Sequence, residues 1–334
     1  MSVKDSSPKL IMSDKVTILS FIHQQKSPVS MGQIKEHIPF TVTDRTVRRW
    51  LNNAANNGDI LIHGNKRTTT YLSTKKSRAF KFLQGKPASL QEQTLKLLRD
   101  FWTHNSTAIE GNTLTLGDTQ FILDEGLTIP GKPIKEHQEI IGHASAIELL
   151  YRMLNTGVTA NHIYDLHKAI QTDVIFDSYT PYGAWKVEPN GTRTRDLNGK
   201  PIYLEYAQPR HVAKLMSEVI HFINTTDQLK TTKSAIHAYA KVHAAIAHIH
   251  PFWDGNGRIA RLLANIPLLN TGLPPIVIPT DRRQEYIQLL ATYELSVGQL
   301  TDSTGVWPKE DALKDFEIFC HQCYETTANI IDIG

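Results

Sequence analysis

The chain has 334 residues, of which 40% are hydrophobic and 21% charged, and its formal net charge is +3. This length favours two parts over a single domain, and the composition excludes a disordered chain because it supplies enough apolar side chains for packed cores. The sequence contains no run of about 18 or more apolar residues and no apolar secretion signal, which argues against a membrane partner and leads us to expect a cytoplasmic protein.

Positive charge is concentrated near the N-terminus, where residues 1–80 carry 13 of the 36 Lys and Arg residues but 5 of the 33 Asp and Glu residues. Helical periodicity and strand-like runs give three helices and a hairpin in this region. The predicted elements are the helices 15–22, 31–38 and 43–54 and the strands 60–62 and 69–72. This order predicts a winged helix-turn-helix domain over residues 1–75, with a linker at 76–90.

In a winged helix-turn-helix domain, the third helix enters the DNA major groove and the hairpin turn contacts phosphate. Basic side chains occur in both places, so the sequence predicts DNA binding. The candidate contacts are Arg45, Arg48, Arg49, Lys66 and Arg67. The alternative is a protein–protein or dimerising module, which would make the chain a homodimer, since basic residues are also ordinary on solvated surfaces.

Residues 91–310 are mainly helical in pattern, and a further helix is predicted over 311–334. The predicted scaffold helices include 116–127, 134–154, 159–172 and 232–249. The last of these contains His237, His243 and His248, whose spacing offers no matching carboxylate for a metal, so we expect packing or surface roles. Cys320 and Cys323 alone do not complete a zinc site and are predicted to lie on an ordinary helix face.

The helical pattern breaks between residues 181 and 209. Asn198-Gly199 is a strong hairpin signal, and the strand-like residues Ile202, Tyr203 and Leu204 follow it. We therefore predict a β-hairpin within residues 198–206. An ordinary surface hairpin and a functional one are both consistent with this pattern.

Residues 250–261 read His-Pro-Phe-Trp-Asp-Gly-Asn-Gly-Arg-Ile-Ala-Arg and combine groups that suit phosphate binding. A turn at 254–257 that leads into a helix places glycines and unpaired backbone N–H groups at a helix N-terminus, where anions bind. Arg258 and Arg261 are three residues apart and share one face of that helix. The segment therefore predicts a polyphosphate site.

Other residues of this segment suit catalysis or packing. Asp254 is an oxygen ligand for a magnesium ion that phosphate oxygens also bind, and His250 can take a proton near neutral pH. Phe252 and Trp253 are predicted to be buried anchors. Pro267 falls two turns into the following helix, so we expect a kink or an early end there.

The segment 250–261 resembles the signature of the Fic family, His-x-Phe-x-Asp/Glu-Gly-Asn-Gly-Arg-x-x-Arg, at every specified position. The resemblance implies a mainly α fold with a Fic-type helical core and a β-hairpin flap. It also implies transfer of AMP from ATP to a protein hydroxyl, with release of pyrophosphate. The implied roles are general base for His250, Mg²⁺ ligand for Asp254, anion hole for Gly255, Asn256 and Gly257, β-phosphate contact for Arg258 and γ-phosphate contact for Arg261. Relatives that transfer the γ-phosphate carry lysine at position 257, so the glycine favours AMP transfer.

Residues 106–112 resemble the inhibitory motif of the same family, Ser/Thr-x-x-x-Glu-Gly/Asn. The motif residues are Ser106, Glu110 and Gly111. A Glu110 carboxylate against Arg261 would occupy the guanidinium that the γ-phosphate needs, so the enzyme would rest inactive. The pattern alone also fits an ordinary helix that ends at Gly111. In some relatives this glutamate also supports removal of AMP, which stays open here.

In the Fic family, a hairpin flap before the catalytic motif pairs with an extended segment of the target protein. The candidate flap residues are Asn198, Gly199, Ile202, Tyr203 and Leu204. Three functions are open at this point. They are an AMP transferase that modifies a target or itself, a DNA-binding regulator that senses ATP without transfer, and a kinase-type relative.

Overall fold

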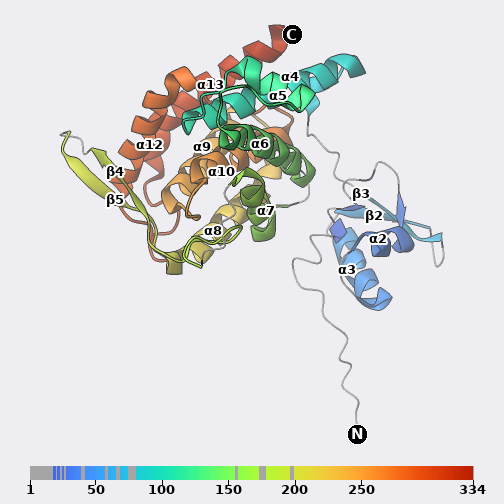
Figure 1. Ribbon diagram of the computed structural model, residues 1–334. Coiled ribbons are helices and arrows are strands. Elements are labelled where there is room, and N and C mark those ends of the chain that lie inside the picture. Colours follow the sequence, from blue (N-terminus) through green and yellow to red (C-terminus); the bar gives the residue numbers. More distant parts are fainter. Residues whose placement is uncertain are drawn as a thin grey trace. The chain divides into compact units, whose positions relative to one another are not determined.

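The computed structural model describes residues 18–19, 21–22, 25, 28–38, 42–56, 59–64, 68–73, 80–154, 157–172, 178–195 and 199–333. Three of the candidate site residues, Lys66, Arg67 and Asn198, lie outside these ranges. The chain divides into two units, residues 1–78 with 153–159 and residues 79–152 with 160–334. Figure 1 shows the elements of both units.

The N-terminal unit contains a small sheet and two well-defined helices. Its elements are β1 (Val29–Ser30), α2 (Met31–His37), α3 (Asp44–Asn56), β2 (Ile60–His63) and β3 (Thr70–Ser73). The strands are antiparallel in the order β1-β3-β2. The sequence predicted β2 and β3 but not β1, because two residues carry no detectable alternation. The assignment of this unit as a winged helix stays a prediction.

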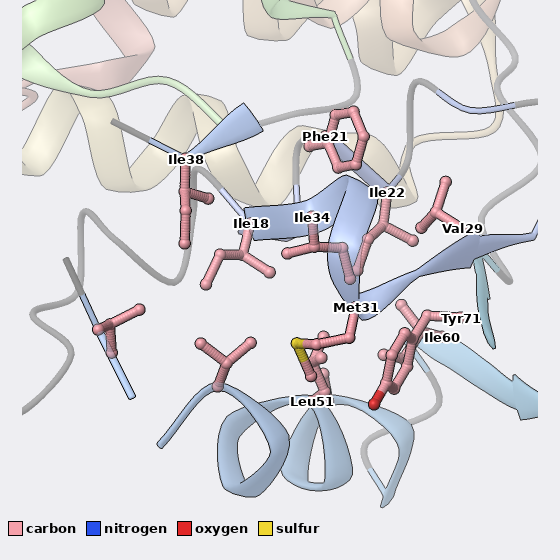
Figure 2. Packing of buried hydrophobic residues seen from close by; sticks show 13 residues of the cluster. Ile18, Phe21, Ile22, Val29, Met31, Ile34, Ile38, Leu51, Ile60 and Tyr71 are labelled. Carbon is pink, nitrogen blue, oxygen red and sulfur yellow. The ribbon is translucent and has the colours of Figure 1, made fainter. Parts of the chain in front are cut away.

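One apolar cluster forms the core of the N-terminal unit, and Figure 2 shows Met31 and Ile34 of α2 facing Leu51 of α3. Tyr71 of β3 completes this packing with 2% exposure. The opposite face of α3 is solvent-exposed and basic. It presents the candidate DNA contacts Arg45, Arg48 and Arg49. Helix α3 is therefore amphipathic, with Thr46, Val47, Leu51 and Ala54 on its buried face.

The second unit is helical. Its helices are α4 (Ala88–Ile109), α5 (Leu116–Glu125), α6 (Ile134–Met153), α7 (Ala160–Ile170), α8 (Pro209–Thr225), α9 (Thr232–Ile249), α10 (Asn256–Leu263), α11 (Ile266–Thr271), α12 (Arg283–Val297) and α13 (Lys314–Ile333), with short 3₁₀ turns at Lys81–Leu83, Thr226–Gln228, Thr280–Arg282 and Glu310–Leu313. Together with the small sheets, they confirm the mainly α fold class. A bilayer-spanning helix is absent from the described ranges, since no helix there combines sufficient length with sufficient apolar character.

Helix α9 lies at the centre of this unit and packs against α8, α10, α11, α12 and α13 (Figure 1). Its many alanines let these neighbours approach closely, and His243 and His248 are fully buried within the packing. His237 instead pairs with Glu310 and Glu317. These are the packing and surface roles that the sequence predicted for the three histidines.

Pro267 has the effect that the sequence predicted. Helix α10 ends at Leu263, and α11 begins at Ile266 with the proline in its first turn, where its missing N–H costs nothing. Asn265 bridges the break, because its side chain contacts both the carbonyl of Arg261 and the backbone of Ile276. The arginines of α10 precede the break and are undisturbed by it.

A two-stranded hairpin projects beside α12 (Figure 1). It pairs β4 (Gly191–Arg195) with β5 (Pro201–Glu205) in antiparallel register, with Arg193 opposite Tyr203. The prediction placed the hairpin within 198–206, so β5 is where it was expected, but β4 lies outside that range. The strand was missed because Gly-Thr-Arg-Thr-Arg lacks apolar alternation.

Candidate active site

A backbone loop between α9 and α10 carries the predicted catalytic segment. His250 ends α9 in the left-handed region, with φ 52° and ψ 59°, and Gly255 precedes α10 with φ 80°. The first N–H groups of α10 therefore begin directly after a glycine that lets a ligand approach the backbone. This is the helix N-terminus that the sequence predicted.

The side chain of Asn256 stabilises this loop. Its Oδ1 accepts the N–H of Phe252 at 2.8 Å, and its Nδ2 donates to the carbonyl of Phe252 at 2.9 Å. Only the backbone N–H of Asn256 is thus free to serve as part of an anion hole. Phe252 is fully buried as predicted, whereas Trp253 is 46% exposed, so its prediction as a buried anchor was wrong. Because the loop reverses direction here, adjacent aromatic side chains point to opposite sides.

His167 supports the same loop from α7. Its ring stacks on Phe252 at 4.0 Å between centroids. Its Nδ1 accepts the N–H of Gly183 at 3.1 Å, so the proton is on Nε2, which donates to the carbonyl of Asp254 at 3.2 Å. Burial lowers the pKa of His167 to about 4 and keeps this neutral tautomer at neutral pH.

The ring of His250 lies flat on Tyr206, with centroids 3.9 Å apart and an interplanar angle of 2°. Its Nδ1 is 3.3 Å from the carbonyl of Ala247, and a carbonyl can only accept, so the proton is on Nδ1. Burial, together with the charge of Lys186, lowers the pKa of His250 to about 4. The unprotonated Nε2 is therefore available as a base at neutral pH.

The two arginines of α10 are bound differently. Arg258 donates to the carbonyl of Ile170 at 3.1 Å and to Asp254 Oδ2 at 3.3 Å. Its exposed fraction is 8%, but its Nε has no hydrogen-bond partner. Arg261 is 2% exposed and is engaged by residues of α4. Thus one guanidinium keeps a free donor, and the other is occupied.

Three contacts from α4 occupy Arg261. Its Nε donates to Ser106 Oγ at 3.0 Å, and its Nη2 donates to the Ser106 carbonyl at 2.9 Å and to Glu110 Oε1 at 2.6 Å. Burial raises the pKa of Glu110, but Arg261 outweighs burial and the pKa is lowered. The carboxylate side chain is nevertheless 43% exposed, so solvent screens part of this attraction.

Gly257 lies directly under the Glu110 carboxylate. A Cβ at this position would be 2.5 Å from Glu110 Oε1 and 3.1 Å from Arg261 Nη1. No side chain fits there while the ion pair is formed. Gly111, with φ 106°, ends the inhibitory segment and lets the chain turn away from α4.

These groups surround a cavity of about 300 Å³. Its lining includes Glu110, His250, Gly257 and Arg261, together with Tyr206 and residues of β4 and α12. Glu294 of α12 also lines it, and burial raises the pKa of that carboxyl to about 8. The cavity is thus lined by the Arg261–Glu110 ion pair and by a second carboxyl group whose raised pKa favours the neutral form.

A buried hydrogen-bond chain fixes Arg261 from the other side. Arg261 Nη1 donates to the hydroxyl of Tyr286 at 3.4 Å, and that hydroxyl lies 2.9 Å from His243 Nε2. Because burial keeps the pKa of His243 well below its usual value, its Nε2 can accept the Tyr286 proton while Nδ1 donates to Tyr239 at 3.3 Å. Ser106 and Glu110 account for three of the described hydrogen bonds to the Arg261 guanidinium, and Tyr286 accounts for the fourth.

The structure gathers most candidate residues at one cavity and leaves others apart. Of the candidates, Glu110, His250, Gly257 and Arg261 line the cavity. Ser106 contacts it only through Arg261, and Asp254 and Arg258 pair with each other. Gly255 and Asn256 precede Gly257 at the start of α10. Of the hairpin, β4 lines the cavity through Thr192, Arg193 and Thr194, while Ile202, Tyr203 and Leu204 lie on β5. Arg45, Arg48 and Arg49 belong to the other unit.

Sequence reasoning missed several residues that contact the catalytic loop or Arg261. They are His167, Lys186, Asn190, Tyr206 and Tyr286. Each lies far along the chain from the residue that it contacts, and none belongs to a local pattern. The Pro-Asn-Gly sequence at 189–191 was a signal for a turn, but it did not indicate that Asn190 reaches the loop.

At this cavity a histidine, the first turn of a helix and an arginine meet, an arrangement typical of phosphate-binding proteins. Residues 157–268 match the sequence model of the Fic/DOC family. Protein adenylyltransferase fic-1 of Caenorhabditis elegans is 32% identical over 272 residues, which are 77% of this chain and 50% of that protein. Protein adenylyltransferase Fic of Drosophila grimshawi is 31% identical over 195 residues, which are 56% of this chain and 36% of that protein.

Among solved structures, a Fic domain containing signaling protein from Bacteroides thetaiotaomicron is similar, with a TM-score of 0.65 and 26% identity over 75% of this chain and 92% of that chain. Residues 157–268 of this chain therefore belong to the Fic/DOC family, as the motif within them predicts. It spans about half the length of the fic-1 protein that it matches.

Proposed function

We propose that this protein transfers AMP from ATP to a hydroxyl side chain of a protein, and that Glu110 restrains the transfer. The observation that carries the proposal is the cavity itself, where an unprotonated His250 nitrogen faces the same space as Arg261 and the start of α10. The names of the C. elegans and Drosophila relatives support it. ATP is then the substrate, and pyrophosphate is the leaving product.

Residues of the cavity and of α10 can supply the base and the phosphate contacts that this reaction needs. His250 Nε2 takes the proton of the target hydroxyl while its oxygen attacks the α-phosphorus. The new oxygen–phosphorus bond forms as the bond between the α-phosphorus and its bridging oxygen breaks, and the electron pair leaves on pyrophosphate. Backbone N–H groups after Gly255, with Arg258 and Arg261, stabilise the phosphate charge.

Magnesium binding is part of this proposal. Asp254 offers one carboxylate, 64% exposed, beside the free donor of Arg258. No cluster of three or more metal-binding side chains occurs among the described residues. A single carboxylate fits magnesium that phosphate oxygens also coordinate, because this ion rarely uses a full protein cage. When bound, the ion would neutralise charge on the α- and β-phosphates.

The target would bind along the hairpin. In the described residues β4 pairs with β5 only, and three of its side chains line the cavity next to His250. An extended target segment added to this edge would bring a hydroxyl toward the base through backbone hydrogen bonds. A flexible segment of the same protein is an equally suitable substrate, so self-modification is included in the proposal.

The source of the transferred group tests this function. We expect Glu110→Gly protein with Mg²⁺ to incorporate label from [α-³²P]ATP into itself or into cell-extract proteins, and none from [γ-³²P]ATP. Label from the γ position alone would make the protein a kinase. No label from either position would favour a nucleotide-sensing regulator. The double variant with His250→Ala serves as the background control.

DNA binding by the N-terminal unit is a second proposal, which the exposed basic face of α3 favours. We expect the Arg48→Ala/Arg49→Ala variant to lose at least tenfold in affinity for duplex DNA in an electrophoretic shift assay at low salt. The physical reason is the loss of two phosphate or base contacts. Lys230→Ala/Lys233→Ala, which removes two exposed charges from the other unit, is the matched control. Equal affinity of the double variant and the parent would remove α3 as the contact.

A further inference from the structure

Lys186 holds the backbone on both sides of His250. Its own N–H donates to the carbonyl of Pro251 at 2.8 Å, and its Nζ donates to the carbonyl of Ile249 at 3.3 Å. The lysine is only 2% exposed, so these contacts lie in the interior. A buried ammonium group with fixed acceptors is a costly feature that a merely structural core would replace with an apolar side chain.

Asn190 binds the next residue of the loop, Phe252, and also contacts Lys186. Its Oδ1 accepts from Lys186 Nζ at 2.5 Å, and its Nδ2 donates to the carbonyl of Phe252 at 3.0 Å. Segment 186–190 therefore binds three backbone carbonyls of the catalytic loop. Strand β4 begins at the following residue, so this segment is also the root of the hairpin.

His250 needs such support because of its backbone conformation. It is one of two residues other than glycine with positive φ in the described chain. A side chain in the left-handed region is strained and persists where the surroundings over-determine it. Lys186 binds the carbonyls of the residues immediately before and after His250, so its contacts fix the chain on both sides of the strained residue.

The other root of the hairpin holds the His250 ring. Tyr206 follows β5 and stacks on the imidazole at 3.9 Å. Its N–H donates to the carbonyl of Asn190 at 3.1 Å, which ties the two roots together. Lys186 Nζ also lies over the Tyr206 ring, 5.9 Å from its centroid. Backbone and ring of the base are thus both positioned by the hairpin.

We propose that Lys186 is a positioning residue for the transfer reaction, which with Asn190 fixes His250 in its left-handed conformation and connects it to the hairpin where the target binds. This inference rests on the proposed AMP transfer. It assigns the hairpin a role in aligning the base as well as in binding the target. The charge of Lys186 has a second effect, because it also acts on the imidazole.

The charged groups that face His250 are Lys186, Asp254 and Glu110. Burial and the lysine lower the pKa of His250, the two carboxylates oppose this, and the net result is a pKa of about 4. Burial also lowers the pKa of Lys186 itself, to about 7. A base is active when unprotonated, so activity is present above the pKa of His250 and lost below it. Removing the lysine charge raises that pKa and moves the acid limb of the rate profile to higher pH.

The test compares Lys186→Met and Lys186→Arg in the Glu110→Gly background. We expect Lys186→Met to lower kcat for AMP transfer about 10- to 100-fold, because misplacing a reacting group by about 1 Å costs as much. The KM for ATP should stay within about twofold, since Lys186 makes no contact with α10. The acid limb should move to higher pH in Lys186→Met. Lys186→Arg keeps a buried positive charge and hydrogen-bond donors. It should therefore restore most of kcat and return the acid limb of the pH–rate profile to its position in the parent.

Unchanged kcat and an unchanged acid limb in Lys186→Met would overturn the inference. So would a methionine variant that loses ATP binding and kcat together, which indicates general damage to the fold. If Lys186→Met does not fold, kcat is measured for Asn190→Ala, which removes the hydrogen bond to the Phe252 carbonyl and keeps the lysine. A lower kcat then supports the inference, and an unchanged kcat overturns it.

A second measurement tests the role of Lys186 even if the proposed AMP transfer is not observed. If the Glu110→Gly parent transfers no AMP, the pKa of His250, assigned by comparison with His250→Ala, is measured by NMR titration in the presence and absence of Lys186→Met. A rise in this pKa supports the placement of Lys186 beside the base, and an unchanged pKa refutes it.

Discussion

Glu110→Gly should raise the initial rate of AMP transfer about 10- to 100-fold. The substitution frees Arg261 Nη2 from a 2.6 Å contact with a carboxylate. A hydrogen bond between charged groups contributes about 1.5–3 kcal/mol, and about 1.4 kcal/mol corresponds to a factor of ten. We place the expected effect nearer the lower end, because the Glu110 side chain is 43% exposed and the ion pair is partly screened. The measurement is incorporation of α-label from ATP over time.

The control is Glu92→Gly, the same substitution at an exposed position of the same helix. It should leave the transfer rate unchanged. Glu110→Gln should activate only in part, because an amide oxygen still accepts from the guanidinium without a charge. Equal rates for the parent and Glu110→Gly would refute the inhibitory role, whatever the absolute activity. The fold should survive in Glu110→Gly, since Ser106 and Tyr286 continue to bind Arg261.

His250→Ala in the Glu110→Gly background should lower the transfer rate about 10²- to 10⁴-fold, the range expected on loss of a general base. The affinity for Mg²⁺ and ATP, measured by calorimetry, should change little. In the proposed reaction, Arg258, Arg261 and the first N–H groups of α10 would bind the phosphates without this imidazole. The loss should therefore fall on kcat, while KM for ATP is nearly unchanged.

His237→Ala is the matched control, because His237 lies near the start of the same helix and contacts Glu310 and Glu317 away from the cavity. Its activity should equal that of the Glu110→Gly parent. A His250→Ala double variant that retains more than about one tenth of the parent rate would be incompatible with general-base catalysis by this residue.

Local patterns in the sequence were sufficient for the parts of the site that lie in one continuous segment. The turn at 254–257, the helix that follows it and the break at Pro267 all depend on residues within a few positions of one another. Helix α9 begins and ends at the predicted residues, Thr232 and Ile249. Short-range sterics and capping decide such features, and they can be read from one chain.

Features that depend on tertiary contacts were beyond these patterns. Strand β4 has a polar sequence and forms because it pairs with β5. Trp253 was predicted to be buried from its side chain alone, but the direction of the loop decides its exposure. Lysine is usually exposed, and nothing near Lys186 in the sequence indicates that the backbone carbonyls of Ile249 and Pro251 lie within its reach.

The contact between Glu110 and the backbone at Gly257 has a consequence for how such a chain can evolve. Any mutation that gives position 257 a side chain places its first carbon where the resting carboxylate now lies. Under the proposed restraint, such a mutation would alter the group that faces the phosphates and displace the Glu110 carboxylate at the same time. Substrate contact and self-restraint would thus depend on one backbone position.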